Sequence, residues 1–199
     1  MPADELPPFV RSLPLAAAAY ELARDLHEGQ HRKWDGAPFL MHPLVVAGLL
    51  DLAGCAEEVV AAGILHDIVE DTEITVADLE ERFGADVARI VDAVSEDEDV
   101  RDYDERKRRL TARVAAAGPD ARAVFAADKI AKVRELRAQI ALAPDQVDSS
   151  PDRRVGYYRQ SLRMLSEHEA EAPLVRQLRF ELWALDRLPP RQPEPSGSG

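Results

Sequence analysis

The amino-acid sequence predicts an all-α protein that folds as one compact domain. Apolar residues recur at helical spacing along most of the chain, and the alternation typical of strands is nearly absent. Gly and Pro residues separate the helical segments. A chain of 199 residues can bury one sizeable core but is short for two. We therefore expect a flexible N-terminus over residues 1–12, a folded domain over 13–188 and a disordered, Pro-rich tail over 189–199.

The helices can be predicted one by one from their ends. The first is Ala-rich and stops before Gly29, and Pro43 is expected at the first position of the second. Thr75 is expected to cap the fourth. In chain order, the predicted helices cover residues 15–28, 43–52, 57–69, 76–83, 86–94, 106–114, 119–141, 153–166 and 173–185.

The charge and composition exclude several classes of protein. The chain has 25 Lys and Arg against 37 Asp and Glu, a net charge of −12, which disfavours nucleic-acid binding and a polybasic membrane anchor. No apolar stretch approaches the roughly 20 residues that span a bilayer, and the N-terminus has no signal-peptide pattern. We therefore expect a cytoplasmic protein. Eight acidic residues and one Arg between residues 92 and 105 predict a solvated loop.

Ionisable residues follow the apolar part of the helix expected over 57–69: His66, Asp67, Glu70 and Asp71. On a continuous helix, His66 and Glu70 are one turn apart, as are Asp67 and Asp71, so these groups would face one small volume. Carboxylates at a helix C-terminus oppose the macrodipole, and a divalent cation would offset this repulsion. We interpret the segment as a candidate metal site. The alternative is an acidic helix end that frays into a loop.

Two residues elsewhere could complete a set of metal ligands. His42 precedes Pro43 in a break between helices, and Asp128 lies within an apolar helical stretch. Each has an ordinary alternative: His42 as a surface or capping residue, and Asp128 as the partner of Lys129 or Lys132. Two imidazoles and two carboxylates together suit Mn, Fe or Zn better than Ca or Mg.

The order and spacing of these motifs resemble the RelA/SpoT-type (p)ppGpp hydrolase domains of the HD superfamily of metal-dependent phosphohydrolases. Three segments carry the resemblance: HEGQHRK at 27–33 with the following His42-Pro43, AGILHDIVEDT at 62–72, and Ala127-Asp128-Lys129. The resemblance extends from about residue 15 to 185 and implies a multi-helix HD-domain fold. Without a synthetase domain, the chain most resembles the single-domain small alarmone hydrolases.

The resemblance implies a role for each group of site residues. It implies four ligands for one cation, expected to be Mn²⁺: His42, His66, Asp67 and Asp128. It implies two carboxylates that act on the attacking water: Glu70 and Asp71. It implies cationic residues in the nucleotide site: Arg24, Arg32, Lys33 and Lys129. For Arg24, a solvated basic surface is an equal alternative.

Lys132 stands where the family pattern has an Asn that helps to hold the nucleotide. We include Lys132 among the substrate-binding residues because a cation can serve a polyphosphate, although recognition of guanine is left open. The expected activity is removal of the 3′-pyrophosphate from (p)ppGpp-like nucleotides, giving GDP or GTP and pyrophosphate. The alternatives are an HD phosphohydrolase acting on (p)ppApp, NADPH or a nucleoside monophosphate, and a catalytically silent nucleotide-binding module. The expected partner is a small nucleotide, and the oligomeric state is not predicted.

Overall fold

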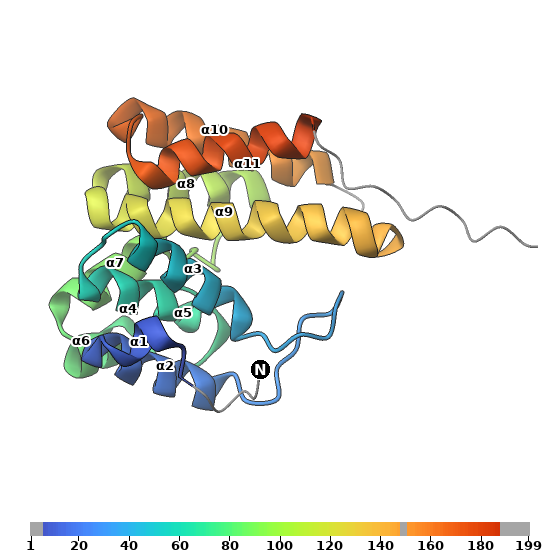
Figure 1. Cartoon of the computed structure of the whole chain (residues 1–199). Coiled ribbons are helices and arrows are strands. Elements are labelled where there is room, and N and C mark those ends of the chain that lie inside the picture. The colour runs from blue at the N-terminus through green and yellow to red at the C-terminus, as the bar shows by residue number, and fades with distance from the viewer. Residues whose placement is uncertain (1–5, 148–150, 188–199) are drawn as a thin grey trace, which may run out of the picture.

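The computed structural model describes residues 6–147 and 151–187, and within these residues it contains helices, turns and loops but no strand (Figure 1). The all-α class is therefore confirmed. In chain order, the elements are α1 (Pro8–Arg11), α2 (Pro14–Leu26), α3 (Met41–Leu52), α4 (Glu57–Leu65), α5 (Ile68–Asp71), α6 (Val76–Phe83), α7 (Ala85–Val94), α8 (Tyr103–Ala116), α9 (Pro119–Leu142), a 3₁₀ turn (Pro144–Gln146), α10 (Pro151–Glu169) and α11 (Pro173–Arg187).

The ends of the chain bear on the predicted domain limits. Helix α1 lies within the segment predicted to be a flexible N-terminus, and its Val10 is fully buried in the core. Packing against the core therefore already includes Leu6, the first described residue, and does not begin at residue 13. Residues 1–5 and the predicted tail over 189–199 lie outside the described residues, so their flexibility stays a prediction.

Helix α9 is the central element of the fold (Figure 1). It packs against α3, α4 and α7 on one side and against α10 and α11 on the other. Buried residues occur all around it between Ala121 and Leu136, which is typical of a helix enclosed by other helices. Charged residues within this buried stretch therefore need partners.

Helices α3 and α4 approach closely at Gly63. A Cβ atom at this position would lie 2.4 Å from Leu50 Cδ1, closer than side chains tolerate. The absence of a side chain lets α4 pack tightly along α3. The approach brings the C-terminal end of α4 beside the first turn of α3, where the imidazole centroids of His42 and His66 are 5.3 Å apart.

The helix predicted over residues 57–69 is not continuous, which corrects the sequence-based expectation. Helix α4 ends at Leu65, residues 66–67 form a turn, and α5 is a single further turn. The His66 ring nitrogen Nδ1 donates a hydrogen bond to the Gly63 carbonyl at 2.9 Å. The bond ties the His66 ring to the last turn of α4, next to the break. The apolar pattern runs on through Ile68 and Val69 and so gave no sign of the break.

Other boundaries follow the sequence more closely. The Thr75 hydroxyl accepts from the Asp78 N–H at 3.2 Å, and the Asp78 carboxylate accepts from the Thr75 N–H at 2.9 Å, which confirms the predicted cap. Helix α3 begins at Met41, so Pro43 lies in its first turn rather than at its first position. The loop predicted over residues 92–105 is shorter, because α7 continues to Val94 and α8 begins at Tyr103. Among the described residues, no helix is both long and apolar enough to cross a bilayer.

Candidate metal centre and active site

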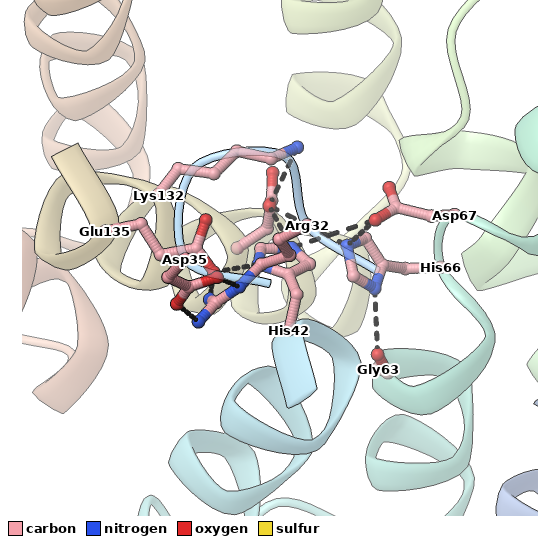
Figure 2. Close-up of polar contacts among 9 residues, drawn as sticks. Arg32, Asp35, His42, Gly63, His66, Asp67, Lys132 and Glu135 are labelled. Carbon is pink, nitrogen blue, oxygen red and sulfur yellow. Dashed lines mark hydrogen bonds and ion pairs between the residues drawn. The ribbon is translucent and has the colours of Figure 1, made fainter. Parts of the chain in front are cut away.

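The structure brings the four predicted metal-binding side chains together. His42 lies on the first turn of α3, His66 and Asp67 form the turn after α4, and Asp128 lies in the middle of α9. His42 Nε2 is 3.2 Å from Asp128 Oδ1 and 3.7 Å from Asp67 Oδ2. His66 Nε2 is 3.0 Å from Asp67 Oδ2 and 3.7 Å from Asp128 Oδ1. Residues distant in the sequence thus present two nitrogens and two oxygens to one small volume (Figure 2).

This donor set fits a divalent cation. His42, His66 and Asp128 are buried, and their ligand atoms lie within 4.8 Å of one another. His66 Nε2 is buried yet makes no hydrogen bond to any residue that the structure describes. Asp67 approaches it without the geometry of a hydrogen bond. Buried polar atoms in proteins normally have partners, and a cation held by all four side chains would supply this one.

The electrostatics of the cluster lead to the same interpretation. Burial lowers the pKa of His66, but the charges of Asp67 and Asp128 outweigh it and raise that pKa to about 10. Burial raises the pKa of Asp67, but the charge of His66 outweighs it and lowers that pKa below its ordinary value. Protons on the imidazoles therefore balance the carboxylates when no cation is bound. Metal binding displaces such protons, because a ligand nitrogen must be unprotonated.

The other nitrogen of each imidazole is held in place. His66 Nδ1 donates to the Gly63 carbonyl at 2.9 Å, and His42 Nδ1 donates to Glu135 Oε1 at 3.2 Å (Figure 2). These bonds leave both Nε2 atoms directed at the cluster. Glu135 was not among the predicted site residues. Its spacing from Asp128 puts both on one face of α9, a signal that the sequence contained.

Glu70 and Asp71, the two predicted catalytic carboxylates, differ in position. Glu70 borders a cavity of about 20 Å³ that the cluster also lines, and Asp71 is exposed on α5. A space of this size holds roughly one water or ion. The Glu96 N–H donates to Glu70 Oε1 at 2.6 Å. Burial raises the pKa of Glu70 to about 6.

A wider cavity of about 460 Å³ adjoins the cluster, and Lys129 and Lys132 line both cavities. Its volume is in the usual range for ligand sites. The Arg153 guanidinium lies 4.3 Å from the Tyr103 ring centroid. Further cationic and aromatic side chains complete the wall: Lys107, Arg154, Trp34, Tyr157 and Tyr158. Cations beside aromatic rings form a surface that can take both the phosphates and the base of a nucleotide.

Three of the predicted substrate-binding residues lie close to the cluster. Lys129 Nζ is 2.5 Å from Asp128 Oδ2, and Lys132 Nζ is 3.0 Å from Asp128 Oδ1. Arg32 Nη1 donates to Glu135 Oε1 at 2.8 Å, at the edge of the wider cavity that Glu135 helps to line. Lys129 is almost completely buried, whereas Lys132 is partly open to solvent.

The other two predicted substrate-binding residues lie apart. Arg24 pairs with Glu21 at 2.5 Å and with Asp25 at 2.9 Å, and it borders a separate cavity. Lys33 is exposed. Neither lines the two cavities that adjoin the cluster.

The acidic loop before α8 is more ordered than the sequence suggested. Glu96 is half-buried, accepts from Arg106 Nε at 2.6 Å and pairs with Lys107. Through its backbone N–H, the same residue holds Glu70. The sequence did contain a signal, because a basic helix start directly follows this acidic segment. Opposite charges so placed favour ion pairs across the loop.

Comparisons with known proteins identify relatives of the chain. The family model described as "HD domain" matches residues 19–149. A probable guanosine-3′,5′-bis(diphosphate) 3′-pyrophosphohydrolase of Synechocystis is 46% identical over 81 residues, 41% of this chain and 10% of the relative. The Danio rerio guanosine-3′,5′-bis(diphosphate) 3′-pyrophosphohydrolase MESH1 is 38% identical over 117 residues, 57% of this chain and 64% of the relative.

A solved structure extends the likeness along the fold. It is described as a metazoan ortholog of SpoT that hydrolyzes ppGpp, and it matches with a TM-score of 0.75 and 27% identity. The match covers 87% of this chain and 96% of that one. The chain spans about a tenth of the Synechocystis relative, which is therefore a much longer protein.

Proposed function

This chain belongs to the HD domain family, and we propose that it is a metal-dependent hydrolase of (p)ppGpp-like nucleotides. The reaction removes the 3′-pyrophosphate and gives GDP or GTP and pyrophosphate. One observation carries the proposal: four side chains able to bind a metal converge beside Lys129 and Lys132, which also line a 460 Å³ cavity rich in cationic and aromatic residues. The predicted cytoplasmic location is part of the same proposal.

The proposed ligands of the cation are His42, His66, Asp67 and Asp128. We propose Mn²⁺ because mixed imidazole and carboxylate ligands suit it. When bound, such a cation lowers the pKa of an attacking water and polarises a phosphoryl oxygen. The four side chains fix the place of this chemistry next to Glu70, which borders the same small cavity.

Glu70 is the proposed general base. With a pKa of about 6 it is mostly ionised at neutral pH, and the Glu96 N–H holds its Oε1 so that Oε2 can accept a proton from the attacking water. The water attacks the phosphorus bonded to the nucleotide 3′-oxygen, that P–O bond breaks, pyrophosphate is released and the 3′-oxygen takes up a proton from solvent. Asp71 is exposed next to Glu70 in the chain, and we assign it the passage of the proton to solvent.

Cationic side chains hold the substrate's phosphates. Lys129 and Lys132 line both cavities and so lie between the proposed metal centre and the wider cavity, where they can offset the charge of the scissile pyrophosphate. Lys107 and Arg153 line the wider cavity but not the small one, which suits the remaining phosphates. Arg32 supports this wall from its edge. Binding by Arg24 and Lys33 stays a prediction.

Lys132 also favours a second candidate activity. It places a cation where the family pattern has an Asn, which suits other phosphorylated nucleotides such as (p)ppApp or NADPH. A panel of these substrates with ppGpp compares the two candidates directly. Tight nucleotide binding without any product would contradict both and would indicate a silent binding module.

The test is hydrolysis of ppGpp by the purified chain, with Mn²⁺ and after chelation, and with the products separated by ion exchange. We expect GDP and pyrophosphate only when Mn²⁺ is present. Asp67→Ala should abolish turnover and metal retention. Asp86→Ala, which removes an exposed carboxylate on α7, is the matched control and should keep both. Turnover that survives chelation in Asp67→Ala would refute the metal assignment.

A further inference from the structure

We propose that Glu135 is a positioning residue that acts directly on the metal ligand His42. The carboxylate lies behind the imidazole, on the side away from the ligand cluster, and Arg32 anchors it there (Figure 2). The inference rests on the metal assignment of the proposed function. It goes further because it assigns to Glu135, which is not a proposed ligand, an effect on how strongly His42 binds the cation.

Glu135, His42 and the proposed metal site follow one another in space: the carboxylate bonds one nitrogen of the imidazole, and the other nitrogen faces the metal site. Glu135 Oε1 accepts from His42 Nδ1 at 3.2 Å, while His42 Nε2 lies 3.2 Å from Asp128 Oδ1 in the cluster. The His42 ring is 5% exposed, so water has little access to compete for its nitrogens. A carboxylate in this position fixes the tautomer and the ring orientation and makes the opposite nitrogen a better electron donor.

The two imidazoles are held in different ways. Behind His66 stands the Gly63 backbone carbonyl, which is neutral and does not depend on a side chain. Behind His42 stands a carboxylate that carries a full charge. The contribution of His42 to metal affinity therefore depends on one replaceable side chain, whereas that of His66 does not.

Glu135 is itself held by the loop before α3. Its Oε1 also accepts from Arg32 Nη1 at 2.8 Å, and Arg32 Nε donates to Asp35 Oδ1 at 3.1 Å. The loop is closed by a bond from the Arg32 N–H to the Ala37 carbonyl at 2.8 Å. Asp35 thus touches Arg32, and in the described structure it has no bond to His42. This difference provides a control that separates an effect on His42 from an effect on the loop.

The experiment measures the Kd for Mn²⁺ by isothermal titration calorimetry in the wild-type chain and in Glu135→Gln, Glu135→Ala and Asp35→Asn. The Gln variant keeps the shape and removes the charge, and the Ala variant removes the acceptor. Loss of a group that hydrogen-bonds a metal-binding histidine typically weakens metal binding by about 10- to 100-fold. We expect that range for the Glu135 variants, with Ala the weaker binder, and a change below about threefold for Asp35→Asn.

The metal-free melting temperature and the visible spectrum of the Co²⁺-loaded chain are measured alongside. We expect Glu135→Gln to melt near the wild-type temperature and to shift the Co²⁺ absorption bands, which a purely structural role would not do. An unchanged Kd in Glu135→Gln, or an equal loss in Asp35→Asn, overturns the inference. If Glu135→Ala does not fold, Glu135→Gln decides alone. A wild-type chain that binds no Mn²⁺ instead overturns the metal assignment itself.

Discussion

Two consecutive carboxylates, Glu70 and Asp71, show how burial sets a role at the scale of the residue. Glu70 borders the small cavity beside the cluster, and burial raises its pKa to about 6. The pKa of Asp71 is also raised, by burial and by the charge of Asp67, but its side chain is exposed. Of these two carboxylates, only Glu70 both lies beside the cluster and has a pKa close to neutral pH.

Glu70→Gln should therefore keep the cation and lose the rate. General acid–base catalysis contributes about 10²-fold or more, so we expect at least this loss in kcat with Mn²⁺ affinity preserved. Steady-state hydrolysis of ppGpp and calorimetric titration of Mn²⁺ measure the two quantities. An unchanged kcat would exclude Glu70 from the proton transfer.

The raised pKa of Glu70 also predicts a pH dependence. A carboxyl group accepts a proton only in its ionised form, so activity should rise with pH through about 6 and level off above it. The measurement is kcat/KM between pH 5 and pH 8 at saturating Mn²⁺. A flat profile across this interval would contradict the assignment, as would an identical acid limb in the residual activity of Glu70→Gln.

At the scale of the element, α9 organises the site because it is enclosed by other helices. One face presents Asp128 and Glu135 to the cluster, while Arg134 Nε pairs with the buried Glu181 of α11 at 2.7 Å. The helix is therefore fixed on both sides. Its cluster residues cannot shift without disturbing the packing against α11.

A helix distant from the cluster provides a test of local stability. The Thr75–Asp78 capping box holds the start of α6, which carries none of the proposed site residues. Thr75→Ala should lower the free energy of unfolding by about 1 kcal/mol, because an N-cap side chain satisfies a helix N–H. Urea denaturation measures the loss, and kcat should stay unchanged. Wild-type stability in this variant would show that the cap contributes nothing.

The sequence predicted the helices well because their signals are local. The cap at Thr75 and the start of α9 at Pro119, for example, are read from residues at the helix ends themselves. The break after α4 was missed because the apolar pattern runs on through Ile68 and Val69.

The candidate site was predicted only in part, because sequence motifs indicate its proposed ligands but not the residues that support them. Motif spacing identified the four proposed ligands, and the structure brings them together. The supporting residues were missed, because Glu135 meets His42 only through tertiary packing and Glu96 acts on Glu70 through its backbone. The sequence signals, the spacing of Glu135 from Asp128 and the basic helix start after Glu96, indicate a shared face or an ion pair but not which residue is contacted.

At the scale of the whole molecule, the cluster joins the first turn of α3, the turn after α4 and the middle of α9. A ligand that binds only the folded state stabilises it by about 2.7 kcal/mol at 100 times its Kd. For a chain of this size that corresponds to a rise in Tm of roughly 5–11 °C. Thermal melts with Mn²⁺ should show this rise, chelation should reverse it, and Asp128→Ala should lack it. An unshifted wild-type Tm would argue against a cation that joins these elements.

The most direct test of a single cation held by these side chains is anomalous scattering at the manganese edge from crystals grown with Mn²⁺. We predict one strong peak in contact with His42 Nε2, His66 Nε2 and the carboxylates of Asp67 and Asp128. A map without a peak between these four groups, or with its peak elsewhere, would contradict the proposed metal centre.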